Sequence, residues 1–255
     1  MNLADVTPLV LTWNEDANIG RTLRALAWAS RVVVIDSGSI DRTREICAGF
    51  PNVGIFVRPF DTHSNQWNFG LDQVPTPWVF SLDADYVPSP ELMAEIAALP
   101  DSSGVIAYRI PLLHCVEGRP LRGSLLPARL ALFQRGSARY IQDGHTQSLA
   151  ATGPTAALRG GIWHDDRKPL DRWLEAQSRY AALEVKKLRG TPWRELGWAD
   201  RARLCIVVAP VAAPLLAWLG RGAVLDGRRG LFYVFQRLLA EVVLSLALLE
   251  RAPKE

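Results

Sequence analysis

The first hundred residues alternate hydrophobic runs with segments whose apolar positions recur at helical spacing. The runs TPLVLTW, RVVVIDSGS, NVGIFVRPF and TPWVFSLDAD predict four strands. The segments EDANIGRTLRALAWA, DRTREICAGF and SNQWNFGLDQV between them predict helices, with Ile19, Leu23 and Leu26 on one face of the first. Strand–helix alternation implies right-handed crossovers, so the pattern predicts a mostly parallel α/β sheet flanked by helices.

The second half of the chain changes pattern twice. Between about residues 100 and 160, GVIAYRIPLLH, ARLALFQRG and TAALRGGIWH predict shorter strands joined by loops that contain Gly and Pro. Residues 169–189 then form the clearest amphipathic helix, with an apolar face marked by Leu170, Trp173, Leu174, Ala181 and Leu188. Two helix ends also carry signals: Asp41 is a good N-cap for the second predicted helix, and Gly190 is a plausible C-cap for this one.

Two apolar segments close the chain, at residues 204–219 and 231–249. The first has 16 residues and contains Pro210 and Pro214, and it is shorter than the roughly 20 residues that a spanning helix needs. The second is long enough but carries Arg237 and Glu241 near its middle, where charge is costly inside a membrane. Flanking arginines favour segments that lie in or on an anionic membrane surface. The alternatives are a soluble helical hairpin packed on the domain and a homo-oligomer interface.

Composition adds an asymmetry of charge to this picture. The net charge is +3 over 255 residues, but residues 1–100 carry 6 Lys and Arg against 12 Asp and Glu, whereas residues 159–255 carry 17 against 11. An acidic half suited to a metal therefore precedes a basic half suited to phosphate or an anionic surface. The sequence has no dense basic stripe, which argues against nucleic acid as a partner. Three widely separated cysteines fit neither a disulfide framework nor a zinc site and indicate a reducing compartment.

Acidic and amide side chains follow the predicted strands. Asn14, Asp36 and Asp83 stand where the first, second and fourth strands end, and ligands of open parallel sheets bind outside the carboxyl ends of the strands. Asp83 and Asp85 are two residues apart, so both carboxylates can face one point, as a hard divalent cation requires. The alternative is that these aspartates only form turns or cap helices.

Four motifs in order, LVLTWNEDANIGRTL, VVVIDSGSIDRTREI, NQWNFGL and WVFSLDADYVPSPEL, resemble the nucleotide-binding half of an inverting family 2 glycosyltransferase with the GT-A fold. The likeness is closer to the small bacterial branch that includes lipopolysaccharide core β-glucosyltransferases. It implies a catalytic domain over residues 1–165, with a nucleotide-sugar half (about 1–100) and an acceptor half (about 101–165). A helical, membrane-associating extension over residues 166–255 follows.

The resemblance also implies roles for individual residues. It places Asp85 on a divalent cation, Mn²⁺ or Mg²⁺, that neutralises the nucleoside diphosphate leaving group, with Asp83 nearer the ribose or the water shell of the metal. In the segment WHDDRKP, His164 offers a further metal ligand, and Arg167 or Lys168 offers a clamp for the diphosphate. A solvated polar turn before the next helix is the alternative.

The resemblance implies that Asp36 contacts the uracil or other base and that Thr12, Asn14 and Glu15 shape the nucleotide pocket. Gln66 and Asn68 lie where the pocket helix of the family approaches the donor.

An inverting transfer needs a general base for the acceptor hydroxyl. The matching region is YIQDGHTQSL, where Thr146 replaces the Glu that relatives tend to have. Asp143 is the nearest carboxylate and is the predicted base, with His145 as the second choice. A tight turn at Asp143–Gly144 is the alternative.

The predicted activity is therefore transfer of a sugar, UDP-linked or linked to another nucleoside diphosphate, to a lipid-linked or surface-glycan acceptor. The predicted location is the cytoplasmic face of the inner membrane. Two other functions stay open: a sugar-1-phosphate nucleotidyltransferase, although the N-terminal stretch lacks a Gly-rich basic loop, and an inactive membrane-peripheral scaffold. The scaffold is kept because Tyr86 stands where relatives usually have an acidic residue.

Overall fold

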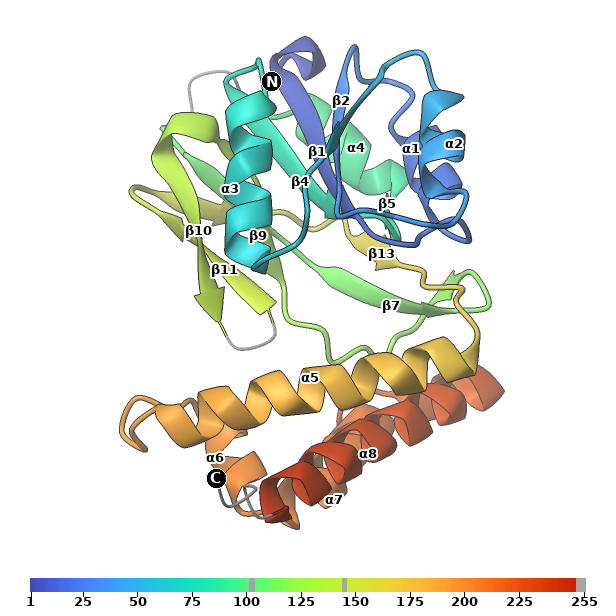
Figure 1. Cartoon of the computed structure of the whole chain (residues 1–255), viewed down its shortest axis with the longest axis vertical. Helices are drawn as coiled ribbons and strands as arrows, with labels where there is room; N and C mark the ends of the chain where they lie inside the picture. The colour runs from blue at the N-terminus through green and yellow to red at the C-terminus, as the bar shows by residue number, and fades with distance from the viewer. Residues whose placement is uncertain (101–103, 144–145, 251–255) are drawn as a thin grey trace. The chain divides into compact units, whose positions relative to one another are not determined.

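The computed structural model describes residues 1–100, 104–143 and 146–250. The chain divides into two compact units, which are drawn together in Figure 1. Unit 1 comprises Met1–Pro120, Leu126–Gln142 and Gln147–Arg167, and unit 2 comprises Leu121–Leu125, Asp143–Thr146 and Lys168–Glu255. Each unit is described by itself.

Unit 1 is built on a seven-stranded sheet in the order β12-β6-β9-β4-β1-β2-β3. Its strands are β1 (Val6–Thr12), β2 (Val32–Asp36), β3 (Val53–Val57), β4 (Trp78–Asp83), β6 (Ala107–Ile110), β9 (Arg129–Gln134) and β12 (Thr155–Ala157). Strands β4, β1, β2 and β3 run parallel, whereas β9 is antiparallel to both β4 and β6. The mostly parallel sheet predicted from the sequence is confirmed.

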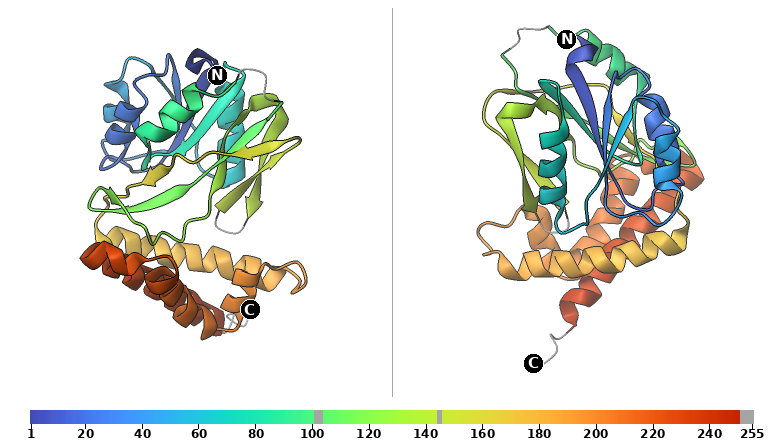
Figure 2. Two further views of the ribbon diagram at one scale, coloured as in Figure 1. Left: turned by 180° about the vertical axis from the view of Figure 1, so that it is seen from behind. Right: turned by 45° about the horizontal axis from the view of Figure 1, so that its top comes forward.

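Helices cover both faces of this sheet because its central strands are apolar throughout. All five residues of β2 are buried, as are six of the seven in β1. One face packs against α1 (Ile19–Ala25), α2 (Thr43–Ala48) and α4 (Pro90–Ala97). The other packs against α3 (His63–Gln73), through Trp67 and Leu71, and against the hairpin of β10 (Ala138–Asp143) and β11 (Thr146–Ala151). Figure 2 shows these layers from two further directions.

A second sheet of unit 1 has the order β5-β13-β7-β8. It consists of β5 (Tyr86–Pro88), β7 (Leu112–Val116), β8 (Arg119–Pro120) and β13 (Ile162–His164). Because β5 begins one residue after Asp85 and pairs antiparallel with β13, the end of the fourth strand of the chain lies beside residues about 80 positions later. The strands β5, β8, β10 and β11 were not expected as separate elements.

Two local expectations for unit 1 need correction. The N-cap of α2 is Arg42, and the carboxylate of Asp41 instead accepts from the backbone N–H of Thr43 at 3.0 Å. Helix α4 was not expected at all, although Ser89 accepts from the backbone N–H of Leu92 and Pro90 occupies its first turn. Both features are ordinary helix-start signals.

Unit 2 is helical and contains α5 (Leu170–Gly190), α6 (Trp198–Leu204), α7 (Val208–Leu215), the π-helical turn η3 (Leu216–Gly220), the 3₁₀ turn η4 (Ala223–Asp226) and α8 (Gly227–Leu249). The C-cap of α5 is Thr191 rather than Gly190. On the predicted apolar face of α5, Ala181 and Leu188 are buried against Leu244, whereas Leu170 and Leu174 are exposed. Among the described residues, one helical stretch, Ala223–Leu249, is long and apolar enough to cross a membrane.

Candidate active site

The fourth strand delivers two carboxylates to the edge of the sheet. Asp83 is the last residue of β4, and Asp85 follows after Ala84. The hydroxyl of Thr22 on α1 donates to the carbonyl of Ala84 at 2.7 Å and fixes the turn between them. The side chain of Asp83 is 36% exposed, whereas that of Asp85 is only 11% exposed. The two aspartates therefore have different surroundings despite their adjacency.

Asp85 pairs with His164 across the second sheet. Strand β13 places His164 opposite Tyr86, and His164 Nε2 lies 3.0 Å from Asp85 Oδ2. Burial lowers the pKa of the imidazole, but attraction to Asp85 outweighs it and raises that pKa to about 9. The other ring nitrogen, Nδ1, is buried and has no hydrogen-bond partner among the described residues. The pair thus presents an anionic oxygen beside an imidazole nitrogen.

These two groups fit a divalent cation in the chemistry of their donors. A carboxylate oxygen and an imidazole nitrogen are both ligands that Mn²⁺ accepts, and an open site completes its shell with phosphate and water oxygens. Within residues 1–100, 104–143 and 146–250, no group of three or more His, Cys, Asp or Glu side chains is gathered as a closed metal site. Asp85 and His164 are the two candidate ligands at this point of the structure.

Asp83 is held by a residue that sequence reasoning missed. Arg129, on the neighbouring strand β9, donates from Nη1 to Asp83 Oδ2 and to the Tyr86 hydroxyl, both at 3.2 Å. With its amide turned to face these donors, Gln147 accepts from Arg129 Nη2 at 2.8 Å and from Trp67 Nε1 at 2.9 Å. Burial lowers the pKa of Arg129, but the carboxylate of Asp83 more than compensates, so the guanidinium stays charged. Tyr86 is therefore part of a buried polar network.

Asp36 ends β2 as predicted and is fully buried. Its Oδ2 accepts from the backbone N–H groups of Gly38 at 3.1 Å and Ser39 at 2.9 Å, and its Oδ1 accepts from the hydroxyl of Ser39. The loop turns through Gly38 at φ 90°, a conformation that L side chains rarely adopt. Asp36 thus shapes the loop after β2, and its contact with a base stays a prediction.

The loop after β1 is tied to the same loop. Asn14 has φ 53°; its backbone N–H donates to Ser39 Oγ, and its side-chain oxygen accepts from the backbone of Ile40, both at 2.9 Å. The backbone N–H of Glu15 donates to Thr43 Oγ1 at 2.7 Å. Thr12 Oγ1 is buried with no hydrogen-bond partner among the described residues. The structure therefore brings Thr12, Asn14 and Glu15 beside the Asp36 loop.

Gln66 and Asn68, the two polar residues predicted to approach the donor from α3, have different surroundings. Gln66 is fully buried: its Nε2 donates to Ser37 Oγ at 2.8 Å and to the carbonyl of Arg58 at 2.9 Å. Asn68 instead exchanges two hydrogen bonds of 3.0 Å with the backbone of Tyr140 on β10. Gln66 therefore supports the loop after β2, and Asn68 fixes the hairpin to α3.

Residues after β13 bind the first helix through a network that sequence reasoning also missed. Asp165 is buried; its Oδ2 lies 3.3 Å from Arg21 Nε and 2.8 Å from Arg167 Nη2. Asn18 donates to Asp166 Oδ1 and accepts from the backbone of Arg167, both at 3.0 Å. Arg167 is half-exposed and paired with Asp165, so its contact with a diphosphate stays a prediction.

The predicted general base falls at the edge of the described chain. Asp143 is the last residue of β10, and no side-chain geometry is described for it. His145 lies outside the described residues. Both assignments stay predictions.

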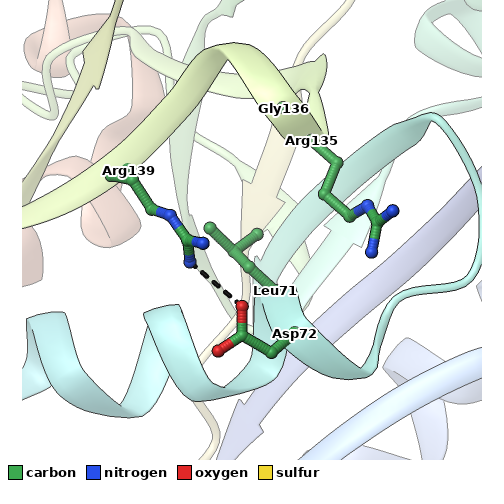
Figure 3. Close-up of a pocket in the computed structure, with 5 residues that line it drawn as sticks. All are labelled: Leu71, Asp72, Arg135, Gly136 and Arg139. Atoms are coloured by element: carbon green, nitrogen blue, oxygen red, sulfur yellow. Dashed lines mark hydrogen bonds and ion pairs between the residues drawn. The ribbon is translucent and has the colours of Figure 1, made fainter.

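Two surface pockets of unit 1 are lined by described residues, and only the first includes the site residue Arg129. One, of about 250 Å³, lies between β9 and the hairpin and is lined by Arg109, Ala128, Arg129, Leu130, Tyr140, Gln147, Ser148 and Leu149. The other, of about 170 Å³, is lined by Leu71, Asp72, Arg135, Gly136 and Arg139, and Arg139 pairs with Asp72 at 3.2 Å (Figure 3). Arg135 follows Gln134, which pairs with the first residue of β4. This second pocket is therefore at the sheet edge opposite Asp83.

Known glycosyltransferases are similar to this chain. The family model described as Glycosyl transferase family 2 matches residues 9–123. The chain is 25% identical over 191 residues to "Lipopolysaccharide core biosynthesis glycosyltransferase LpsC" of Rhizobium meliloti, covering 71% of this chain and 70% of that protein. It is 29% identical to "Uncharacterized glycosyltransferase RP128" of Rickettsia prowazekii, over 72% of this chain and 68% of that protein. The resemblance stated from the sequence is confirmed.

A solved structure agrees in fold. The chain resembles S. aureus TarS 1-349, crystallised in complex with UDP, with a TM-score of 0.50 and 14% sequence identity. The match covers 93% of this chain and 89% of that one. The predicted GT-A fold class is confirmed.

Proposed function

We propose that this chain, a glycosyltransferase of family 2 with the GT-A fold, transfers a sugar with inversion from a UDP-linked donor to a lipopolysaccharide or other lipid-linked surface glycan. The similarity to a lipopolysaccharide core glycosyltransferase supports the acceptor class. The single observation that carries the chemistry is the Asp85–His164 pair at 3.0 Å, directly after the strand that ends in Asp83.

Asp85 and His164 would hold a divalent cation, Mn²⁺ or Mg²⁺. When bound, the cation neutralises charge that develops on the departing nucleoside diphosphate. His164 is protonated while it pairs with Asp85 at neutral pH, because its pKa is raised to about 9. Because a metal ligand must be the unprotonated imidazole, His164 would have to give up this proton to hold a cation.

Asp83 would contact the ribose or the water shell of the metal, with Arg129 as its positioning partner. Arg129 fixes Asp83 Oδ2 and the Tyr86 hydroxyl from one guanidinium nitrogen. A preorganised carboxylate needs no reorganisation when the donor enters. The acidic residue that relatives usually have at the position of Tyr86 is replaced here by a hydroxyl that completes this arrangement, which supports an active site over an inactive scaffold.

The bond changes are those of a single displacement. The acceptor oxygen attacks the anomeric carbon, the bond to the diphosphate oxygen breaks, and the acceptor proton passes to a general base. Asp143 is the proposed base and His145 the second choice. Thr12, Asn14, Glu15, Asp36 and Gln66 would form the nucleotide side of the pocket, Asn68 would support it through the hairpin, and Arg167 would meet the diphosphate.

The reaction is tested with the acceptor that accumulates when this protein is missing. Glycolipids extracted from a deletion strain are incubated with the purified chain, Mn²⁺ and radiolabelled UDP-sugars, and the products are analysed by mass spectrometry. The proposal expects the gain of one sugar and its loss with a chelator. Intact glycans in the deletion strain together with no transfer from any donor would overturn it.

A further inference from the structure

Helix α8, the last helix of unit 2, exposes large apolar side chains and buries polar ones, which is the opposite of a surface helix in a water-soluble protein. Along α8, the exposed large side chains are Leu231, Phe232, Phe235, Leu239, Leu246 and Leu249. Their spacing of three, four, seven or eight places them on one side of the helix. Only 22% of the most apolar window in Ala223–Leu249 is buried, so this helix is not the core of the unit.

Three polar residues of α8, Tyr233, Glu241 and Ser245, face inward and have partners within unit 2. The hydroxyl of Tyr233 accepts from the backbone N–H of Leu125 at 2.9 Å, and Ser245 Oγ donates to the carbonyl of Ile206 at 2.8 Å. Glu241 is 5% exposed and pairs with Arg203 at 3.3 Å and with Arg237 at 3.5 Å. The mid-segment charges that argue against a membrane helix are therefore neutralised inside the unit.

Helix α7 repeats this arrangement beside α8. Along α7 and η3, the exposed side chains Val208, Val211, Leu215 and Leu219 recur every three or four residues, whereas Ala209 and Ala217 are buried. Surface helices of soluble proteins show the opposite pattern. An exposed apolar surface that extends over two helices marks contact with a membrane or a partner.

Length and charge decide how this surface meets a bilayer. The stretch Val208–Gly220 has 13 residues and is about 20 Å long at 1.5 Å per residue, which is too short for a core of about 30 Å. Arg221 lies in the turn between η3 and α8, and Arg228 and Arg229 follow in the first turn of α8. Inserting this region first would bring three arginines into hydrocarbon, at high cost.

We infer that α7, η3 and α8 lie flat in the headgroup region of an anionic lipid leaflet, with their apolar sides toward the acyl chains and these arginines among the phosphates. Buried apolar area supplies the binding, and the arginines supply the preference for anionic lipid. This surface is separate from the proposed sugar transfer, and it holds the protein where a lipid-linked acceptor lies.

Flotation with sugar-free vesicles tests the surface, so a failure here leaves the proposed reaction standing. The full-length chain is mixed with vesicles of phosphatidylglycerol and phosphatidylcholine, or of phosphatidylcholine alone. We expect wild type to float with the anionic vesicles. We expect Phe235→Asp/Leu246→Asp to reduce that binding at least about tenfold, and Arg221→Glu/Arg228→Glu to remove the preference for phosphatidylglycerol. The matched control is Ile141→Asp, at an exposed apolar position in unit 1.

A labelling experiment tests the orientation. Cysteines introduced as Arg221→Cys or Glu250→Cys, each with the exposed Cys205 replaced by Ser, are treated with a membrane-impermeant maleimide on sealed vesicles. Reaction at both positions supports a flat orientation, whereas protection of either one overturns it. Circular dichroism and light scattering accompany each variant. One outcome would overturn the lipid assignment: the wild-type chain does not bind vesicles and instead forms a dimer that Phe235→Asp dissociates. The apolar surface would then bind a second copy of the chain.

Discussion

Unit 1 and unit 2 use apolar side chains in opposite ways. In unit 1 the apolar residues of β1, β2 and β4 are buried, and polar groups gather at the ends of these strands. In unit 2 exposed apolar side chains line one side of α7 and of α8, and Tyr233, Glu241 and Ser245 of α8 point inward. Apolar side chains thus form a solvent-excluded core in one unit and a surface in the other. The two units differ in where polar residues find their partners: at the ends of the strands in unit 1, and on the inward side of α8 in unit 2.

The largest expected effect is on catalysis in unit 1. Asp85→Asn should lower turnover about 10³-fold, because a metal contact at the leaving group contributes several kcal/mol. Lipid binding by unit 2 should be unchanged. Turnover is measured with saturating Mn²⁺ and donor, and affinity for UDP and Mn²⁺ by calorimetry. Asp72→Asn, in the pocket at the opposite edge of the sheet, is the control; if the Asp85 variant keeps turnover within tenfold of wild type, the metal assignment is wrong.

The next effect concerns the inward charges of unit 2. Arg203 pairs with Glu184 at 3.5 Å, Asp200 at 3.2 Å and Glu241 at 3.3 Å, and both glutamates are buried. Arg203→Ala should lower the free energy of unfolding by about 3–5 kcal/mol, because it leaves buried carboxylates without this partner. Urea denaturation measures this free energy of unfolding. Arg172→Ala, on the exposed side of α5, should change stability by less than about 0.5 kcal/mol; equal losses in the two variants would contradict the network.

A third effect tests close packing in unit 1. A Cβ at Gly160 would lie 2.3 Å from Leu92 Cα and 2.5 Å from Leu92 N on α4. Because backbone atoms must shift to make room, Gly160→Ala should destabilise the protein by about 1–3 kcal/mol. Thermal unfolding measures the loss. At Gly136 an added Cβ meets nothing within 4 Å, so an unchanged melting temperature is expected for Gly136→Ala, and equal shifts would count against the packing argument.

The smallest effect concerns the hairpin that flanks Arg129. Asn68→Ala removes two hydrogen bonds to the backbone of Tyr140 and should cost about 1–2 kcal/mol. Amide hydrogen exchange in β10 should be faster in the variant than in the wild type, whereas exchange in β1 should be unchanged. Asn65→Ala, whose side chain donates to the exposed Asp61, is the matched control. Unchanged protection of β10 would show that other contacts hold the hairpin.

The sequence predicted the parallel half of the sheet well, because each of its strands is a continuous apolar run between helices. The positions of Asp36, Asp83 and Asp85 followed from that topology, since parallel strands present their carboxyl ends at one edge. Short strands such as β5 and β13 could not be delimited from the sequence, because three residues are too few to show a hydrophobic periodicity. Ser89 and Pro90 carry helix-start signals, although no helix is predicted after them from the sequence.

Site contacts between distant segments could not be predicted. Arg129 and Asp83 are 46 residues apart, and Arg21 and Asp165 are 144 apart. Nothing in the local sequence of an arginine indicates which carboxylate it will meet in space. The inward direction of Glu241 was equally hidden, because the sequence shows a charge within an apolar helix without the Arg203 that neutralises it.

The pairing of β5 with β13 has a consequence for how the protein is made. His164 reaches Asp85 only through this pairing, and it lies 41 residues beyond the segment 9–123 that the family model matches. Because His164 follows Asp85 by 79 residues, the pair can form only after β13 has been synthesised. The proposed cation site would therefore be complete only late in translation.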